Sequence, residues 1–264
     1  MSAEIVERVL RSARYRDIDR SMLERFADQE FARARNADDA VKRVKRRLHQ
    51  AVGAFRGATR PGAMAAAWSG DLAATAFRAA CAEALRAHAS TRERLDSLDT
   101  FYNGIWSLTG VPSRLLDLGC GLNPLTLPWM GLPPEATYLA SDVDRRPLAT
   151  VASFLELVRQ PHEVEVLDVL EGPPDHAADV ALMLKLVTTL DRQSPEASAN
   201  LLRALRVRHA LVSFPRQSLG GRGKGMDRTY RERLDRLVAD AGRVTGVAEA
   251  SVPSELVFVL TLDG

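Results

Sequence analysis

The segment Leu115–Gly121, with the sequence LLDLGCG, constrains the fold more than any other part of the chain. Its run of leucines around one aspartate predicts a buried strand, and Gly119 and Gly121 predict a tight turn at the carboxyl end of that strand. Missing side chains at such a turn allow a ligand to lie against the backbone. The segment therefore predicts an α/β domain with a ligand at this turn, although a turn without a ligand would have the same pattern.

The residues around this turn indicate which ligand it would hold. In a dinucleotide-binding motif the third glycine would stand at position 124, and this chain has Pro124 there. That departure disfavours NAD and FAD, because both the close helix packing and the pyrophosphate contact are compromised. Asp117, before the turn, suits a cationic amino-acid ligand, since a carboxylate can hold an ammonium group directly or through water.

Short apolar runs alternate with helical patterns from Arg114 onward, which is typical of a parallel sheet covered by helices. We expect seven strands, at residues 114–118, 137–140, 163–167, 180–184, 210–214, 246–252 and 256–262. The connection Pro253–Glu255 is too short for a parallel crossover, so the last two strands should form an antiparallel hairpin. A parallel sheet that ends in such a hairpin fits a Rossmann-like methyltransferase better than a dehydrogenase.

Carboxylates stand at the ends of three successive predicted strands, the first of them Asp117. Asp142 stands where doubly wound folds place the carboxylate that binds ribose hydroxyls, with Asp144 as the second candidate. Asp168 ends the third strand, where it could accept a hydrogen bond from an adenine amino group. A single aspartate at a strand end is often a helix cap, but three in succession favour a binding site.

The next two strands end in residues suited to a substrate. Leu184 and Lys185 end the fourth strand, at the edge where substrates of open α/β sheets bind, although Lys185 could simply be a solvated strand end. After the fifth strand, Phe214 could stack on a base and Arg216 could hold a phosphate. Phe214 could equally be an ordinary core residue.

The first hundred residues are rich in Ala, Arg, Leu and Glu at helical spacing, and they carry 19 Lys and Arg against 14 Asp and Glu. We therefore expect two domains: a helical, basic domain at residues 1–104 that docks on RNA, and a catalytic domain at 105–264. A solvated helix surface would show such a charge asymmetry nearly as often. The candidate RNA-binding residues of the first domain are Lys42, Arg43, Lys45, Arg46 and Arg47. A Gly-rich basic loop at Pro215–Met226 adds Arg222 and Lys224.

Several other classes of protein are disfavoured. The stretch Gly220–Gly225 lacks the first glycine and the Ser or Thr of a P-loop, the five histidines lack metal-ligand spacing, and no Gly-x-Ser-x-Gly segment occurs. We therefore expect neither an ATPase, a metal site nor a serine hydrolase. No apolar stretch has the roughly 18 residues of a membrane span, and the charged first 25 residues do not resemble a signal peptide. We expect a cytoplasmic protein without a membrane partner.

Five motifs together resemble the aminoglycoside-resistance 16S ribosomal RNA methyltransferases, the Arm/Rmt family, which modify N7 of guanine 1405. The motifs are HASTRER at 88–94, LDLGCGLNP at 116–124, YLASDVD at 138–144, LMLKL at 182–186 and SFPR at 213–216. The resemblance covers nearly the whole chain, and the element Ser90–Arg94 is its most distinctive part. It implies a class I fold that binds S-adenosyl-L-methionine (SAM) and releases S-adenosyl-L-homocysteine (SAH).

The resemblance also implies roles for individual residues. Arg94, with Arg92 as the alternative, would reach the SAM carboxylate, and Gly119 and Gly121 would line the methionine arm. Asp142 would hold the ribose and Asp168 the adenine, with Leu184 and Lys185 near the cofactor and the target. The substrate would be the assembled 30S subunit, methylated by a monomer that confers aminoglycoside resistance.

Guanine chemistry sets the expected mechanism. N7 carries a free lone pair at neutral pH, so catalysis needs positioning and no general base. The base must leave its helix, and Phe214 or Trp106 could hold it by stacking while Lys185 helps to position it. We expect Phe214→Ala to lose methylation and keep cofactor binding. The alternatives are another ribosomal nucleotide such as adenine 1408, a catalytically silent RNA-binding or assembly protein, or a nicotinamide oxidoreductase, which Pro124 disfavours.

Overall fold

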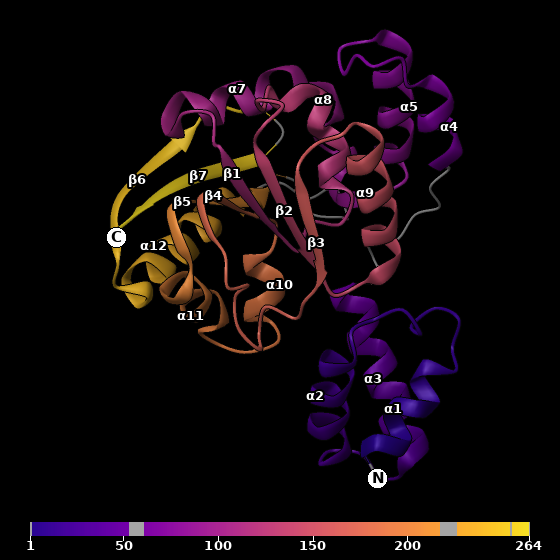
Figure 1. Cartoon of the computed structure of the whole chain (residues 1–264). Coiled ribbons are helices and arrows are strands. Elements are labelled where there is room, and N and C mark those ends of the chain that lie inside the picture. The colour runs from indigo at the N-terminus through magenta and orange to yellow at the C-terminus, as the bar shows by residue number, and fades with distance from the viewer. Residues whose placement is uncertain (1, 53–60, 217–225, 254, 264) are drawn as a thin grey trace.

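A single mixed sheet forms the centre of the catalytic domain (Figure 1). The computed structural model describes residues 2–52, 61–216, 226–253 and 255–263. The strands are β1 (Arg114–Leu118), β2 (Thr137–Asp142), β3 (His162–Val166), β4 (Ala177–Leu184), β5 (Arg206–Pro215), β6 (Val244–Ala250) and β7 (Glu255–Leu262). They lie in the order β3-β2-β1-β4-β5-β7-β6.

The seven predicted strands are all present in the described residues. The strands β1 to β5 are mutually parallel, and β7 pairs antiparallel with both β5 and β6, which confirms the predicted hairpin. The strand β5 begins at Arg206, four residues before the predicted start at Ala210. Its first residues alternate exposed arginines with buried Val207, so a search for a continuous apolar run misses them.

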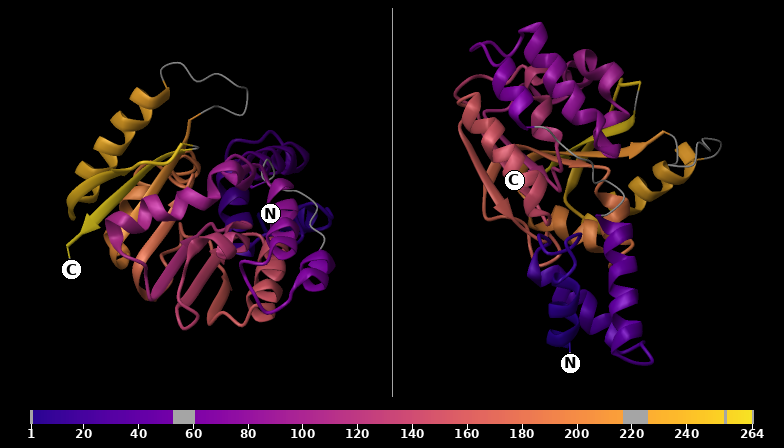
Figure 2. Two further views of the ribbon diagram at one scale, coloured as in Figure 1. Left: turned by 90° about the horizontal axis from the view of Figure 1, so that it is seen from above. Right: turned by 90° about the vertical axis from the view of Figure 1, so that its right-hand side faces the viewer.

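Side chains of each strand alternate between two hydrophobic cores, one on each face of the sheet. In β4, Val180 and Leu182 pack into the first core, and Ala181 and Met183 pack into the second. The first face is covered by α4 (Pro61–Ala67), α5 (Thr75–Arg86), α7 (Leu98–Thr109), α8 (Leu127–Met130) and α9 (Arg145–Leu157). The other face is covered by α10 (Val187–Asp191), α11 (Ala197–Ala204) and α12 (Met226–Ala241) (Figure 2). Within the described ranges, no helix is both long and apolar enough to cross a membrane.

The first three helices form a unit of their own, which we call the three-helix unit (residues 2–52). It consists of α1 (Ser2–Leu10), α2 (Arg20–Phe31) and α3 (Ala37–Ala51), and it stands apart from the helices that cover the sheet (Figure 1). Its core is separate from those of the sheet and includes Ile5, Val9, Leu23, Phe26, Val44 and Leu48.

This arrangement differs from the predicted boundary at residue 104. The helices α4, α5 and α7 supply Met64, Phe77, Phe101 and other apolar residues to the core of the sheet. The hydrophobic cores therefore divide after the three-helix unit, before α4. Helical periodicity shows that each of these helices has an apolar face, but it does not show which partner that face packs against.

Backbone hydrogen bonds hold the three-helix unit to the loop that follows β2. The Asp19 amide donates to the Val143 carbonyl at 2.7 Å, and the Arg145 amide donates to the Asp17 carbonyl at 2.9 Å. A bridge between Ile18 and Asp144 lies between these bonds. The unit is therefore fixed beside the carboxyl end of β2.

Candidate active site

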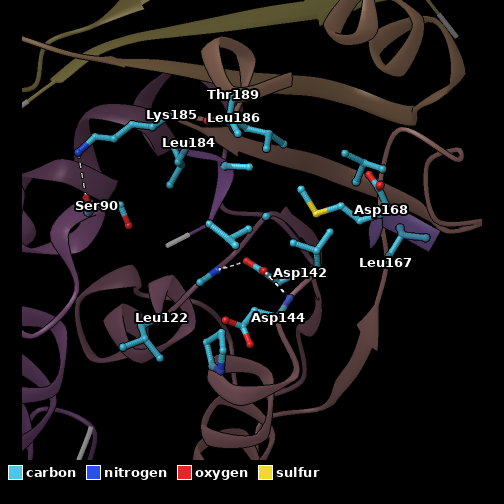
Figure 3. Close-up of a pocket in the computed structure, with 18 of the residues that line it drawn as sticks. Ser90, Leu122, Asp142, Asp144, Leu167, Asp168, Leu184, Lys185, Leu186 and Thr189 are labelled. Atoms are coloured by element: carbon cyan, nitrogen blue, oxygen red, sulfur yellow. Dashed lines mark hydrogen bonds between the residues drawn. The ribbon is translucent and has the colours of Figure 1, made fainter. Parts of the chain in front are cut away.

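A cavity of about 300 Å³ lies at the carboxyl ends of β1 to β4 (Figure 3). The segments after these strands line it, together with residues of the three-helix unit and of the short helix α6 (Ala89–Arg92) with its N-cap His88. The described lining includes Met22, Val52, His88, Ser90, Gly119, Gly121, Leu122, Asp142, Asp168, Leu184, Lys185 and Gln193. Its volume falls at the lower end of the range for small-molecule sites. The predicted strand-end residues Asp142, Asp168, Leu184 and Lys185 are thus brought together.

The turn after β1 requires glycine at two positions. Gly119 and Gly121 have φ angles of 61° and 52°, in the left-handed region that disfavours other residues. A Cβ atom would meet Leu186 Cδ1 at 3.0 Å if added to Gly119, and His88 Cε1 at 2.9 Å if added to Gly121. The backbone conformation and the close approach of neighbours both restrict the turn to glycine.

Asp142 is fixed at the centre of the cavity wall. Its carboxylate accepts hydrogen bonds from the amides of Gly121 at 2.9 Å and Asp144 at 3.0 Å. Burial raises the pKa of Asp142 to about 6, although these two hydrogen bonds act to lower it. Asp144, the second candidate, is buried and caps α9 through the Arg146 amide. Of the two, Asp142 is the one whose carboxylate bridges the glycine turn and the loop after β2.

Asp168 lies at the far end of the cavity from Lys185 (Figure 3). It is 4% exposed, and its Oδ1 accepts from the Leu170 amide at 3.1 Å. Its Oδ2 accepts from the guanidinium of Arg25, on α2 of the three-helix unit. Sequence reasoning missed Arg25, since no local pattern relates it to a residue 143 positions away.

Asp117 does not line the cavity, where the sequence predicted it to hold an ammonium group. It is almost fully buried and is not one of the described residues that line the cavity. Its carboxylate accepts from the Tyr138 hydroxyl at 2.6 Å and from Asn123 Nδ2 at 2.9 Å, while burial raises its pKa to about 6. Asp117 therefore supports the turn from behind, and it makes no direct contact with the space where a cationic ligand was expected.

Arg94 is also behind the cavity lining, with 1% of its surface exposed. Its Nε donates to Glu255 Oε1 at 2.9 Å, and its Nη1 donates to Asn123 Oδ1 at 2.6 Å. Arg92, the alternative for a cofactor contact, is exposed. In this structure the Arg94 guanidinium is occupied by protein partners, so the predicted contact with a cofactor carboxylate would require these bonds to be shared or exchanged.

Glu255 is a buried carboxylate that sequence reasoning missed. It lies at the start of β7, where its Oε1 is 3.1 Å from Lys185 Nζ and its Oε2 accepts from the Ser213 hydroxyl at 2.6 Å. Burial alone would raise its pKa, but the charges of Arg94 and Lys185 and the bond from Ser213 outweigh burial and lower the pKa. Its role depends on contacts between distant strands, which have no signal in the local sequence.

Lys185 adopts a strained backbone conformation at the cavity wall, with φ of 58°. Its ammonium donates to the Ser90 carbonyl at 2.9 Å and to the Glu93 carboxylate at 2.6 Å. Lys185 therefore joins the segment before α7 to the end of β4. The side chain is held in one place, as a group that positions a substrate would need to be.

Phe214 is a core residue, contrary to the prediction that it stacks on a base. It is fully buried between the sheet and α12, with its ring 4.8 Å from that of Tyr230 and 6.3 Å from that of Phe258. It is not among the described residues of the cavity lining. Trp106, the other aromatic candidate, is buried with its indole bonded to the Met130 carbonyl. Neither ring can reach a base without leaving its place in the core.

The predicted basic helix is α3, and its cations differ in availability. Lys42 and Arg46 are exposed, and Lys45 is half-buried. Arg43 bonds to Asp39 at 3.1 Å, and Arg47 lies 3.2 Å from Glu30 with its guanidinium over the Phe26 ring. Arg43 and Arg47 therefore stabilise the three-helix unit as well as contributing charge.

The cations predicted after β5 are only partly described. Arg216 is half-buried, lies 3.8 Å from Asp227 and donates to the Val252 carbonyl at 3.4 Å. Arg222 and Lys224 lie outside the described residues.

Comparison with known proteins extends these observations over the whole chain. Residues 11–259 match the family described as ribosomal RNA methyltransferase (FmrO). The chain is 40% identical to a 16S rRNA (guanine(1405)-N(7))-methyltransferase of Frankia casuarinae, over 96% of this chain and 91% of the relative. A protein of the same name from Micromonospora echinospora is 34% identical, over 97% and 95%.

Solved structures give the same result for the fold. The crystal structure of the 16S rRNA methyltransferase RmtF in complex with SAH superimposes with a TM-score of 0.82 at 30% identity, over 99% of this chain and 98% of the other. The 16S rRNA methylase RmtB superimposes with a TM-score of 0.79 at 28% identity, over 100% and 99%. These similarities include the three-helix unit as well as the sheet.

Proposed function

Because the chain belongs to the ribosomal RNA methyltransferase (FmrO) family, we propose that it methylates N7 of guanine 1405 in 16S rRNA. The family predicted from the five motifs is confirmed, as are the Rossmann-like class I fold and the SAM-dependent methyltransferase class of enzyme. The proposal is carried by similarity over nearly the whole chain to relatives that are all named as guanine 1405 N7-methyltransferases. The cavity at the carboxyl ends of β1 to β4 agrees with it, because open α/β sheets bind their ligands at this edge.

The residues of the cavity fit SAM. The glycine turn leaves room that a Cβ atom would fill, and carboxylates stand at the ends of β2 and β3. Asp142 would accept hydrogen bonds from the ribose, and Asp168 would accept one from the adenine amino group. Gly119 and Gly121 would line the methionine arm. When bound, the cofactor supplies a methyl group on a positively charged sulfur.

Methyl transfer to N7 of guanine depends on positioning and not on proton transfer. N7 of guanine carries a free lone pair at neutral pH, so no side chain needs to act as a general base. Burial lowers the pKa of His88, in the cavity wall, to about 4, and the nearby charges of Arg94 and Lys185 act in the same direction. His88 is therefore neutral at physiological pH and adds no charge beside the cofactor. The three N–H groups of Lys185 face Ser90, Glu93 and Glu255. Lys185 would therefore position the target base by fixing the cavity wall around it, since a direct bond to the base would require one of these partners to be exchanged.

The three-helix unit would dock the enzyme on its substrate. Its exposed cations Lys42 and Arg46, together with the half-buried Lys45, suit contacts with RNA phosphates. We propose that the substrate is the assembled 30S subunit, that the enzyme acts as a monomer in the cytoplasm, and that methylation confers aminoglycoside resistance.

Incubation with labelled SAM tests this function. Unmethylated 30S subunits and free 16S rRNA serve as parallel substrates, and borohydride with aniline cleaves the product at an N7-methylated guanine. The proposal expects cleavage at guanine 1405 in subunits only. Label without cleavage would show that the methyl group is on another atom, such as one of adenine 1408. Absence of label on both substrates would refute an rRNA methyltransferase activity.

A further inference from the structure

Arg25 joins the three-helix unit to two residues of the cavity wall. The guanidinium is largely buried, with 17% of the side chain exposed, and it donates to Asp168 Oδ2. Its Nη1 and Nη2 also approach Gln193 Oε1, both at 3.3 Å. Asp168 and Gln193 both line the cavity. One side chain of α2 thus connects two parts of the cavity wall.

Other residues of the three-helix unit form part of the wall itself. Met22, one turn before Arg25 on α2, lines the cavity, as do Ala51 and Val52 at the end of α3. The backbone bonds of Asp17 and Asp19 hold the loop between Asp142 and α9. The unit therefore contacts the segments that follow two of the strands, β2 and β3.

We propose that Arg25 is a positioning residue of the cofactor site, and that the three-helix unit is consequently a part of that site as well as a docking surface. Asp168 is almost fully buried, and its carboxylate has lone pairs for a ligand beyond those used by Arg25 and the Leu170 amide. The hydrogen bond from Arg25 fixes the rotation of the carboxylate, so that it stays in the cavity wall with lone pairs available to a ligand. The proposal rests on the proposed function, because adenine is the group assigned to Asp168.

If the three-helix unit must be in place for tight cofactor binding, then bound cofactor must also hold the unit in place, since coupling between two sites is reciprocal. The cofactor would thereby order the surface that meets the RNA. Arg25 is the residue through which this coupling would act.

Calorimetry on the full chain tests the positioning role, with SAH and S-inosyl-L-homocysteine as ligands. The second ligand carries oxygen in place of the adenine amino group. For Arg25→Ala we expect the Kd of SAH to rise about tenfold, as befits a lost charge-assisted bond, and the Kd of the inosyl ligand to change about twofold or less. Arg25→Lys should recover part of the SAH affinity, because one donor remains although the planar fork is lost.

Arg20→Ala is the matched control, since Arg20 lies on the same helix and forms exposed pairs with Glu7 and Glu24. It should leave both Kd values unchanged. Equal increases in both Kd values for Arg25→Ala would show a merely structural role and overturn the proposal. A Kd for SAH equal to that of the wild type would also overturn it. Absence of SAH binding by the wild-type protein would instead overturn the proposed function itself.

Amide hydrogen exchange tests the coupling independently of affinity. At saturating SAH, exchange of the α2 amides should slow in the wild-type protein and in Arg20→Ala. In Arg25→Ala, with SAH raised to saturation, that protection should be lost while the amides of the glycine turn remain protected. Protection confined to the sheet edge in the wild-type protein would overturn the coupling.

Discussion

The Glu255 carboxylate accepts a hydrogen bond from Arg94 at 2.9 Å, although the two residues are 161 positions apart in the chain. Lys185 Nζ lies 3.1 Å from the same carboxylate oxygen. The segment before α7, the end of β4 and the start of β7 are therefore joined by one buried negative charge between two cations. This junction fixes the Lys185 side of the cavity.

Replacing Glu255 by glutamine should destabilise the fold strongly. Arg94 would remain buried with its charge no longer compensated, which typically costs about 3 to 5 kcal/mol when one partner of a buried pair is lost. Urea denaturation would measure the change. The double variant Arg94→Met with Glu255→Gln should lose less than the sum of the two single changes, because the buried cation is gone as well. A loss below about 1 kcal/mol for Glu255→Gln would contradict a structural role for this charge.

Gly121→Ala should abolish SAH binding and destabilise the protein. The added Cβ would lie 2.9 Å from His88 Cε1, in addition to the strain of a φ of 52°. Gly131→Ala is the matched control, because Gly131 has a similar φ of 64° and its Cβ would meet no atom of the described residues within 4 Å. The control isolates the backbone strain, of about 1 kcal/mol. Equal stability loss at the two positions would show that His88 moves freely out of the way.

Local sequence was enough to predict the sheet and the glycine turn, because both depend on neighbouring residues. The apolar run Val180–Leu184 and the pair Gly119 and Gly121 each carry their own signal. Arg25 and Glu255 could not be found in this way, since their roles arise when segments more than a hundred positions apart meet. Phe214 shows a different limit, because its pattern was visible in the sequence but fitted two roles. An aromatic residue at a strand end can stack on a target base or fill the core, and only the packing of α12 decides between these roles.

The position of Phe214 changes the outcome expected for Phe214→Ala. The ring stacks on Tyr230 at 4.8 Å within the core, so truncation should cost about 3 to 5 kcal/mol of folding free energy. Folding and SAH binding should therefore weaken together, instead of methylation alone. Thermal unfolding with and without SAH would separate the two. A variant of normal stability that binds SAH and fails to methylate would instead support the role first predicted for Phe214, which is stacking on the target base.

The exposed cations of α3 should govern binding to 30S subunits. For Lys42→Glu with Arg46→Glu, we expect weaker binding and a salt dependence reduced by about one unit of slope for each lost phosphate contact. Arg206→Glu is the control, since Arg206 is exposed at the amino end of β5, opposite the cavity edge. Filter binding at several salt concentrations would measure both. An unchanged slope in the double variant would exclude these two residues from the RNA contact.

His88 should make the stability of the protein depend on pH. Burial, with the charges of Arg94 and Lys185, lowers its pKa from 6.5 to about 4, so the folded state favours the neutral ring. This contribution is fully present above pH 6.5 and is lost as the pH falls toward 4, because the unfolded chain takes up the proton first. Between pH 7 and pH 5 the loss amounts to about 2 kcal/mol.

The measurement must separate His88 from carboxylates that act in the opposite direction. Asp117 and Asp142 have pKa values raised to about 6, so lowering the pH through that value relieves their buried charge and favours folding. The useful quantity is therefore the difference in unfolding free energy between the wild-type protein and His88→Gln, measured by urea denaturation at pH 7 and pH 5. That difference should shrink by about 2 kcal/mol at the lower pH, since the variant has no imidazole to protonate. A difference that is the same at pH 7 and pH 5 would mean that the His88 imidazole protonates freely in the folded state.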